Sequence, residues 1–555
     1  MVPTPTVLVV GAGPSGLVAA LTLRRNGVPV RLIDRRTIYH GAIRGTSIQP
    51  RTLELLELLG VLKDVLDIST PPYTMAIHGT GHEVVSDIQW ADEADPSPGI
   101  PYAGPINLHQ STFEEVLRKS VEKLGVTIEL GVELLGYEQD VDAEGAVGGD
   151  SVGVRLRLPA GEEVREEFEY VVAADGARGS TRRMLGLEFL GETKETDRML
   201  VANTECTDID REHWHRWGQF GKLVFFLKPV PPAPTFQIQS LGPDLPSPLP
   251  PDNDAIQKLF NAVSQSSNIQ LRNSSWMSEW RANMRMVSRF SVGRVYLVGD
   301  SAHCHSPTGG QGTNTGITDA FNLTWKIALV HHKLSPPSLL ESYASERMPV
   351  VAEMLNLTAQ LHALAFHAPR RGAMPPSTLD ARGAVQASAD PMFRPKHVLQ
   401  LGVNYRWSSI VREGREADGA RDATAEHSPY GVAGSRLRAG DRAPDAPALV
   451  EGEGGRARRL FELIRGGSKH AILVFTSSVA PLPALDRYCR LGVASVVVLH
   501  PQGAASHPAH VGEDVRCFVD TAGHAYAGYE VEGRATMFVV VRPDGMIGAY
   551  ATGVE

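Results

Sequence analysis

Cysteine is scarce in this sequence. Four of its 555 residues are cysteine, and no two of them form a CxxC pair; they are Cys206, Cys304, Cys489 and Cys517. A disulfide framework or a zinc site built on cysteine pairs is therefore not expected. His303 and His305 flank Cys304, but adjacent side chains of an extended chain point to opposite sides and no further ligand pair accompanies them, so we expect no metal site.

The sequence also lacks long apolar runs and an excess of positive charge. No run reaches the roughly 18 apolar residues of a transmembrane helix, and the first apolar run, Val7 to Val10, is too short for a secretory leader. The formal net charge is -9, and 42% of the residues are hydrophobic. We therefore expect a cytoplasmic protein without a nucleic-acid or membrane partner, folded in roughly two to four domains.

A glycine motif follows the first apolar run. The sequence Gly11-Ala12-Gly13-Pro14-Ser15-Gly16 separates that run from an apolar-periodic segment, and Asp34 ends the next strand-like run, 18 residues after Gly16. Glycines let a pyrophosphate approach a helix N-terminus, and a carboxylate at this distance reaches a ribose hydroxyl. The pattern predicts a dinucleotide site; the alternative is a tight turn in an ordinary α/β domain.

A second glycine-rich stretch runs from Gly299 to Lys326. An apolar strand ends at Val298, Asp300 follows, and the turn from Gly309 to Gly312 leads into a helix that we expect to start near Asn314. Backbone without Cβ atoms can approach a flat ligand, and the positive end of the helix favours an electron-rich one. This stretch predicts a ring-binding site at the carboxyl end of a strand.

A third candidate is the turn after the strand from Tyr170 to Ala174. Asp175-Gly176 is followed by Arg178, Arg182 and Arg183, which could meet both a ribose and a phosphate. A solvated basic turn explains these residues equally well. Both interpretations stay open on the sequence alone.

The rest of the chain is patterned in blocks. Residues 70–108 and 186–290 read as strands and loops, and Ser111 with Glu114 predicts a capping box for a helix that ends near Leu124. Trp276 and Trp280 have helix-like spacing and are expected to pack. Residues 411–445 read as a linker, and the strand-like runs 471–475, 494–499 and 536–541 predict a compact α/β domain without a catalytic role.

On these motifs the chain resembles the single-component FAD-dependent aromatic hydroxylases, the family of para-hydroxybenzoate hydroxylase, over nearly its whole length. The motifs are Gly11 to Gly16, Asp175-Gly176, and Gly299-Asp300 with its extension through Pro307, Gly310-Gln311-Gly312, Asn314 and Asp319. Within the family it is similar to the phenol hydroxylase-like branch, which has a C-terminal thioredoxin-like domain.

The resemblance implies an α/β fold of three parts. A Rossmann-like FAD-binding domain would comprise residues 1–70, 109–185 and 286–410. An interleaved substrate domain with a mixed or antiparallel sheet would comprise residues 71–108 and 186–285. A linker, 411–435, would precede a thioredoxin-like domain, 436–555, without redox function because it has no CxxC pair. A homodimer through this last domain would fit.

The resemblance also implies roles for single residues. The first motif and Asp34 would hold the ADP half of FAD, Pro307 would lie at the reactive edge of the flavin, and N–H groups near Gly312 would face its N1 and C2 carbonyl. The implied cofactor-binding residues are Gly11, Gly13, Pro14, Ser15, Gly16, Asp34, Arg35, Arg44, Gln110, Asp175, Asp300, Pro307, Gly310, Gln311, Gly312, Thr313 and Asn314. His303 would pack beneath the flavin loop as a structural residue.

The implied reaction is hydroxylation of a phenol or another electron-rich aromatic ring. NADPH or NADH would reduce FAD, dioxygen would add to it, and a C4a-hydroperoxide would transfer a hydroxyl to the ring, while the protein excludes water. A Baeyer-Villiger oxygenase on the same scaffold is the alternative, and a flavin-binding assembly protein without turnover is another. No WxWxIP-like halogenase motif and no hydrophobic tail of a membrane epoxidase occur.

Three positions depart from the family pattern. Gly179 stands where the Asp-Gly motif usually has serine, and the strand Thr235-Phe236-Gln237 lacks the arginine and tyrosine that related hydroxylases carry. Thr46 stands where phenol hydroxylases tend to have an acid. We expect Thr46 and Gln237 to contact the substrate, and the sequence identifies no general base.

Overall fold

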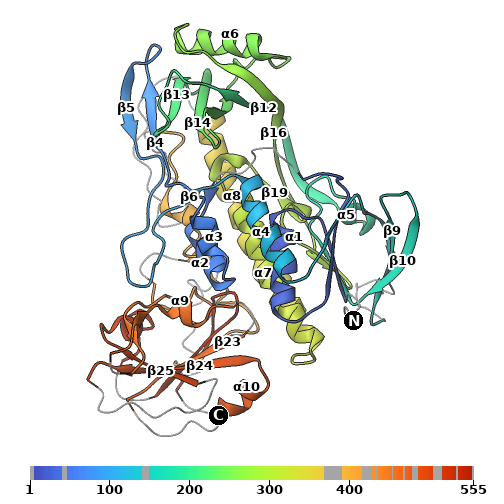
Figure 1. Ribbon diagram of the computed structural model, residues 1–555, viewed down its shortest axis with the longest axis vertical. Helices are drawn as coiled ribbons and strands as arrows, with labels where there is room; N and C mark the ends of the chain where they lie inside the picture. Colours follow the sequence, from blue (N-terminus) through green and yellow to red (C-terminus); the bar gives the residue numbers. More distant parts are fainter. Residues whose placement is uncertain are drawn as a thin grey trace.

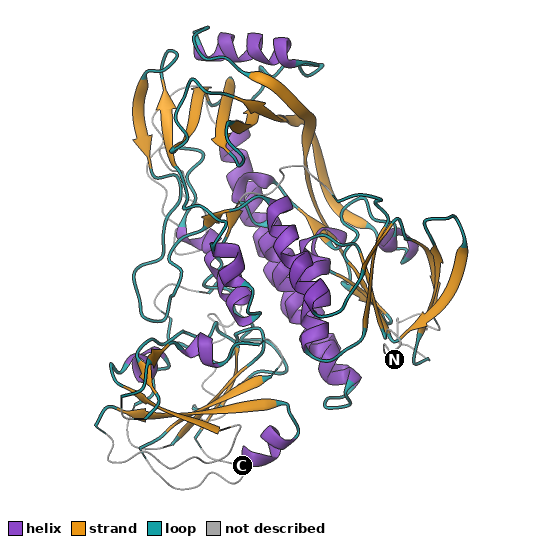
Figure 2. Cartoon of the chain, viewed as in Figure 1, coloured by secondary structure: helices purple, strands orange, loops and turns teal. Residues whose placement is uncertain are grey.

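The computed structural model describes residues 6–39, 47–139, 149–367, 390–415, 428–431 and 435–552, the last range with gaps at 453, 467–468, 478–484, 504–514 and 533–535. Figure 1 shows long central helices between two large sheets, with the C-terminal strands at the bottom of the view. In Figure 2 the strands gather in three places around these helices. The predicted site residues Arg44 and Thr46 lie outside the described residues.

A six-stranded sheet forms the base of the N-terminal part, in the order β17-β18-β11-β1-β2-β7. All neighbours pair in parallel except β17 with β18. The strands are β1 (Val7–Val10), β2 (Val30–Asp34), β7 (Ile128–Leu130), β11 (Tyr170–Ala173), β17 (Ser291–Val292) and β18 (Val295–Leu297).

Both faces of this sheet are covered, which explains the continuous apolar run of β1. Val7 and Val9 pack in one core with helices α1 (Pro14–Arg25), α4 (Gln110–Lys123) and α7 (Gly312–His331). Leu8 and Val10 pack on the other side against a three-stranded sheet. Its strands are β8 (Glu133–Glu138), β9 (Val152–Arg157) and β10 (Glu163–Phe168).

An eight-stranded sheet lies above, in the order β19-β16-β12-β15-β14-β13-β4-β5. It joins two stretches far apart in the sequence, because β4 pairs with β13. Its strands are β4 (Thr74–His78), β5 (Val84–Ile88), β12 (Phe189–Glu205), β13 (His213–Gln219), β14 (Leu223–Pro229), β15 (Thr235–Leu241), β16 (Arg272–Val287) and β19 (His303–Cys304). Helix α6 (Asn253–Ser264) covers its outer face (Figure 1).

Short elements and one long helix connect these layers. Helix α8 (Glu341–His367) packs against α7 and β16. Strand β3 (Ser47–Ile48) pairs with β6 (Ile106–Asn107) beside the cavity described below. The remaining elements of this part are α2 (Pro50–Leu58), α3 (Leu62–Leu66) and α5 (Thr181–Met184), with 3-10 turns η1 (Gly299–Ser301), η2 (Pro307–Gly309), η3 (Pro337–Leu340) and η4 (Lys396–Leu399).

The C-terminal part is built on a mixed eight-stranded sheet in the order β20-β27-β26-β23-β24-β25-β21-β22. Its strands are β20 (Arg412–Glu413), β21 (Leu449–Val450), β22 (Ala457–Arg458), β23 (His470–Phe475), β24 (Ala494–Pro501), β25 (Val515–Asp520), β26 (Met537–Val541) and β27 (Ile547–Ala551). Its helices are α9 (Leu460–Leu463), α10 (Asp486–Arg490) and α11 (His524–Gly528). The α/β character predicted for this region is confirmed.

The linker predicted at residues 411–435 does not begin where the composition suggested. Residues Arg412–Glu413 form β20, which pairs in parallel with β27 at the edge of the C-terminal sheet. Glu413 also accepts hydrogen bonds from Arg415 and from the N–H of Ala439. A high content of charged and small residues therefore hid an edge strand, since edge strands tolerate such residues.

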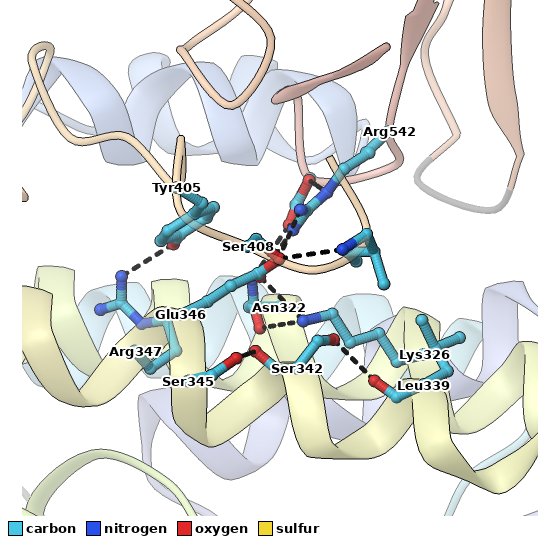
Figure 3. A network of polar contacts seen from close by, with 12 residues as sticks. Asn322, Lys326, Leu339, Ser342, Ser345, Glu346, Arg347, Tyr405, Ser408 and Arg542 are labelled. Carbon is cyan, nitrogen blue, oxygen red and sulfur yellow. Dashed lines mark hydrogen bonds and ion pairs between the residues drawn. The ribbon is translucent and has the colours of Figure 1, made fainter. Parts of the chain in front are cut away.

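A buried polar network joins the C-terminal sheet to the central helices (Figure 3). Arg542 donates to both carboxylate oxygens of Glu346 on α8, at 2.7 and 2.9 Å. Lys326 on α7 donates to the same carboxylate at 2.8 Å, and Ser408 donates at 2.6 Å. Both members of the Arg542 and Glu346 pair are almost fully buried, so the two parts of the chain form one packed body.

Candidate active site

One cavity of about 1180 Å³ lies between the carboxyl ends of the parallel strands and the inner face of the eight-stranded sheet. It brings together residues that the three separate motifs contribute. The predicted site residues that line it are Gly11, Gly13, Pro14, Ser15, Asp34, Arg35, Gln110, Asp175, Gln237, Asp300, Pro307, Gly310, Gln311, Gly312 and Thr313. Gly16 and Asn314 are not among its lining residues.

The first glycine turn leaves room on the cavity side and none on the other. A Cβ atom at Gly16 would come within 1.9 Å of the Gly11 carbonyl oxygen. A Cβ atom at Gly13 would meet nothing within 4 Å. Gly13 is the residue before helix α1, in an extended conformation, so the open space lies at a helix N-terminus where a phosphate is favoured.

Asp34 is already engaged within the protein. Its Oδ2 accepts from the N–H of Ala12 at 2.9 Å and from the guanidinium of Arg36 at 2.8 Å, and its Oδ1 accepts from the N–H and Nε of Arg36. Burial alone would raise the pKa of Asp34, but these hydrogen bonds hold it below its usual value. The Arg36 side chain at this carboxylate is half-exposed.

Asp175 lines the cavity. Its Oδ2 accepts from the N–H and hydroxyl of Thr181 at 3.0 and 2.9 Å, whereas its Oδ1 is buried and has no partner among the described residues. Burial raises the pKa of Asp175. A Cβ atom at Gly179 would lie 2.2 Å from the Asp175 carboxyl carbon, so glycine instead of serine at 179 lets the carboxylate take this position.

Asp319, which does not line the cavity, fixes the Gly299 stretch in place. Its Oδ2 accepts from the N–H of Gly299 at 3.1 Å and lies 2.6 Å from His303 Nε2, while Oδ1 accepts from Arg347 at 2.7 Å. His303 is fully buried and stacks on Phe290. The structural role predicted for His303 is confirmed, and the exposed Asp300 lies on the cavity side of the same turn.

Helix α7 starts at Gly312, slightly before the predicted position. Its first backbone hydrogen bond runs from the N–H of Thr315 to the Gln311 carbonyl, so the N–H groups of residues 312–314 have no partner within the helix. Of these residues, Gly312 and Thr313 line the cavity at the positive end of the helix. An electron-rich ring system placed there would be stabilised.

The side chain of Asn314 braces the turn from behind. Its Oδ1 accepts from the N–H of Gln49 at 2.8 Å, and its Nδ2 donates to the carbonyls of Ser47 at 3.1 Å and Gly310 at 2.7 Å. Gln311 is also buried and donates to the Gly309 and Val398 carbonyls. These amides hold the shape of the turn, and Asn314 is fully buried behind it.

The capping box predicted at Ser111 is wrong. Helix α4 begins at Gln110, its N-cap residue is His109, and no side chain caps it. The side chain of Gln110 donates to the Glu114 carboxylate at 2.8 Å, which draws Glu114 away from a capping position. Gln110 therefore lies in the first helical turn, on the cavity wall.

The inner face of the eight-stranded sheet forms the roof of the cavity, and alternate residues of each strand face the cavity or the opposite side. On β15, Phe236 and Ile238 pack toward α6, while Gln237 and Gln239 face the cavity and hydrogen bond to each other at 2.8 Å. Trp276 and Trp280, which were expected to pack, lie on strand β16, and both line the cavity. Their spacing of four residues places them on one face of a strand as well as of a helix.

The sequence alone did not reveal one residue of the cavity wall and one polar cluster next to Pro307. Lys228 on β14 is buried and lines the roof; its signal was a lone cation at an alternating position of an apolar strand. The cluster is centred on His362, whose ring lies 3.0 Å from the hydroxyl of Ser306, next to Pro307, and 2.8 Å from the carboxylate of the buried Asp197. His367 contacts the same Asp197 carboxylate at 2.9 Å. Asp197, His362 and His367 are grouped closely enough to hold a metal ion.

No helix in the described ranges is both long and apolar enough to cross a membrane. Residues 4–358 match the family model described as FAD binding domain. The chain is 34% identical to a flavin-dependent monooxygenase of Mycobacteroides abscessus, over 86% of this chain and 90% of that protein. It is 29% identical to pentachlorophenol 4-monooxygenase of Sphingobium chlorophenolicum, over 98% and 93%.

Solved structures agree with the fold. The crystal structure of the flavin-dependent monooxygenase PieE in complex with FAD and substrate superposes with a TM-score of 0.78 at 23% identity, covering 99% of this chain and 97% of that one. Aklavinone-11 hydroxylase in a ternary complex with FAD and aklavinone gives 0.74 at 22%, covering 99% and 95%. This chain belongs to the family of FAD-dependent aromatic monooxygenases.

Proposed function

We propose that this protein hydroxylates a phenol or another electron-rich aromatic compound, with FAD as cofactor and NADPH or NADH and dioxygen as co-substrates. The observation that supports this most is the single cavity, in which the glycine turns of the parallel sheet face a roof of aromatic and amide side chains. Bound FAD would supply the oxidation-reduction chemistry and the activation of dioxygen.

The residues present fit the cofactor. We propose that the open side of Gly13 accommodates the pyrophosphate, that Asp175 contacts the cofactor, and that Asp300 meets its ribityl or pyrophosphate part. The N–H groups of residues 312–314 would face the polar edge of the ring, and Pro307 would lie at its reactive edge. The remaining cofactor-binding residues inferred from the sequence, including Arg44, stay predictions.

The substrate side is proposed on the roof. Gln237 and the aromatic rings of Trp214 and Trp280 line the cavity opposite the glycine turns, where they would hold a flat ring and exclude water. Thr46 stays a predicted contact. One of the relatives is named for pentachlorophenol, which is consistent with a phenolic substrate for this chain.

We also propose that residues 436–555 form a thioredoxin-like domain without redox function. Cys489 and Cys517 belong to one apolar cluster, and burial raises the pKa of the Cys517 thiol, which disfavours thiol chemistry. The three-part domain division and a homodimer through this domain stay predictions.

The test is NAD(P)H oxidation by the purified protein with a panel of phenols. We expect a yellow protein whose slow oxidation of NADPH or NADH is accelerated by at least one phenol, with a product heavier by one oxygen atom in mass spectrometry. A protein that does not bind FAD would contradict the proposal. Bound FAD without acceleration by any phenol would favour a carbonyl-directed oxygenase or a protein without turnover.

A further inference from the structure

Lys228 occupies an unusual place in the roof of the cavity. On β14, Phe225 and Leu227 pack toward α6, so Lys228 points to the opposite, cavity-facing side with Phe226. Its side chain is only 3% exposed. In the register of the sheet it stands directly opposite Gln237, which faces the same cavity.

The amine is held by polar and aromatic neighbours. Lys228 Nζ donates to Asn107 Oδ1 at 3.0 Å, and it lies 5.2 Å from the centre of the Trp214 ring. The Asn107 amide is fixed in turn, because its Nδ2 donates to the Pro71 carbonyl at 2.8 Å. The Lys228 head group is thus oriented by two strands of the roof and by β6.

Short contacts connect this position to the glycine turn. Asn107 on β6 pairs with Ser47 on β3, and the Ser47 carbonyl accepts a hydrogen bond from Asn314 in the first turn of α7. The same Asn314 side chain binds the Gly310 carbonyl. Lys228 therefore lies where the roof meets the segment that is expected to carry the reactive part of the cofactor.

We propose that Lys228 is the base that accepts the proton of the substrate's phenolic hydroxyl and then holds the phenolate oxygen against its ammonium group. This inference rests on the proposed function. In the step, the phenolic O–H bond breaks, its electron pair stays on oxygen, and the proton bonds to Nζ, so net charge is conserved and no other reactant is needed. The phenolate ring is more electron-rich, which favours attack on an electrophilic oxygen.

The protonation state of Lys228 supports this role. Burial lowers the pKa of Lys228 to about 7, so the neutral amine is available near neutral pH. The titratable neighbour is His109 at the start of α4; burial and the charge of Lys228 lower its pKa to about 4, so His109 is neutral in this range. Asn107, Gln237 and Trp214 do not titrate.

The experiment compares the FAD-loaded wild type with Lys228→Met and Lys228→Arg. For a weakly acidic phenol that accelerates NAD(P)H oxidation, we expect Lys228→Met to lower kcat/KM about a hundredfold at neutral pH, the typical contribution of a general base. The acid limb of the wild-type pH profile, with an apparent pKa near 7, should disappear. Lys228→Arg keeps the charge but cannot accept a proton, so it should fail with weakly acidic phenols and recover with phenols that are already ionised in solution.

The control is Lys222→Met, because Lys222 is exposed just before the same strand and its replacement removes one charge outside the cavity. Its kcat/KM and pH profile should match the wild type. Unchanged kcat/KM in Lys228→Met, or an equal loss for ionised and neutral phenols in both Lys228 variants, would overturn the proposal.

A binding measurement separates this inference from the proposed function. If no phenol accelerates NAD(P)H oxidation, the proposed function fails, and the absorbance of 4-nitrophenol bound to the FAD-loaded protein still reports on Lys228. A bound form that is more ionised than in free solution with wild type, but not with Lys228→Met, supports Lys228 as the proton acceptor. No change in ionisation, or no binding, contradicts it.

Discussion

Gly13 and Gly16 belong to the same turn, but different neighbours constrain them. Gly16 lies against backbone, because a Cβ atom added there would overlap the Gly11 carbonyl oxygen. Gly13 touches nothing on its Cβ side and has an extended backbone that other residues can adopt. Gly16 is therefore required by the fold, and Gly13 by whatever enters the cavity.

This contrast gives a matched pair of variants. Gly13→Val should leave the thermal unfolding of the FAD-free protein nearly unchanged, because the new side chain enters open space. Its Kd for FAD should rise by about tenfold or more, because a bulky group at a helix N-terminus blocks the close approach of a phosphate. Gly16→Val should lower the stability itself by about 1–3 kcal/mol or more through overpacking. Calorimetry and flavin fluorescence titration measure both, and equal FAD affinity in Gly13→Val would remove the pyrophosphate assignment.

Helix α7 connects the site to the core at two levels. Asn314 in its first turn ties the glycine turn to β3, and Asp319 one turn further on ties Gly299 and His303 to Arg347 of α8. Burial alone would raise the pKa of Asp319, but the charges of Arg347 and His303 hold it below its usual value. The element is therefore anchored by charge in its middle and by an amide at its start.

Removing the amide should loosen the site. Asn314→Ala leaves the Ser47 and Gly310 carbonyls and the Gln49 N–H without this partner, and we expect a loss of about 2–3 kcal/mol in the free energy of unfolding. Guanidinium unfolding curves measure this loss. Asn268→Ala, an exposed loop position, serves as the control and should change stability by less than about 0.5 kcal/mol.

At the scale of the whole molecule, the polar network of Figure 3 decides how the C-terminal part is attached. Burial alone would raise the pKa of Glu346, but the charges of Arg542 and Lys326 hold it far below its usual value of 4.5. Burial lowers the pKa of Lys326 to about 8 despite Glu346. Removing either the carboxylate or one of its two cationic partners would leave a buried charge uncompensated, which is costly in the free energy of unfolding.

The network predicts a specific acid response. Because the folded-state pKa of Glu346 is depressed, its contribution to stability is present above pH 4.5 and is lost as pH falls below that value. Glu346→Gln should therefore flatten the stability curve in this acid range. Arg542→Met, which leaves the carboxylate buried without its guanidinium partner, should cost about 3–5 kcal/mol near neutral pH.

Chemical denaturation at a series of pH values measures both effects. Lys63→Met is a suitable control, since Lys63 pairs with Asp67 on the exposed surface and such pairs contribute little. A Glu346→Gln variant that keeps the full acid dependence of the wild type would show that other carboxylates control acid unfolding.

Much of the fold was readable from local pattern. The runs at Val7 and Val295, each followed by glycine, predicted strands, because short continuous apolar segments bounded by turn residues are typical of buried strands. The strands of the C-terminal part were predicted for the same reason. The capping box at Ser111 and the start of the linker at residue 411 were wrong, because a side-chain contact to Glu114 and an edge-strand pairing with β27 override local propensity.

By itself the sequence determined that glycine turns follow the strands ending at Val10 and Val298, and it predicted a ligand site at each, while the turn at Asp175-Gly176 stayed open between a ligand site and a solvated turn. It could not determine the roof. Strands separated by more than a hundred residues pair there, and the period of two decides which side chains face inward only once the sheet is assembled. Lys228 thereby faces the cavity opposite Gln237, and its pKa depends on burial that only tertiary packing creates.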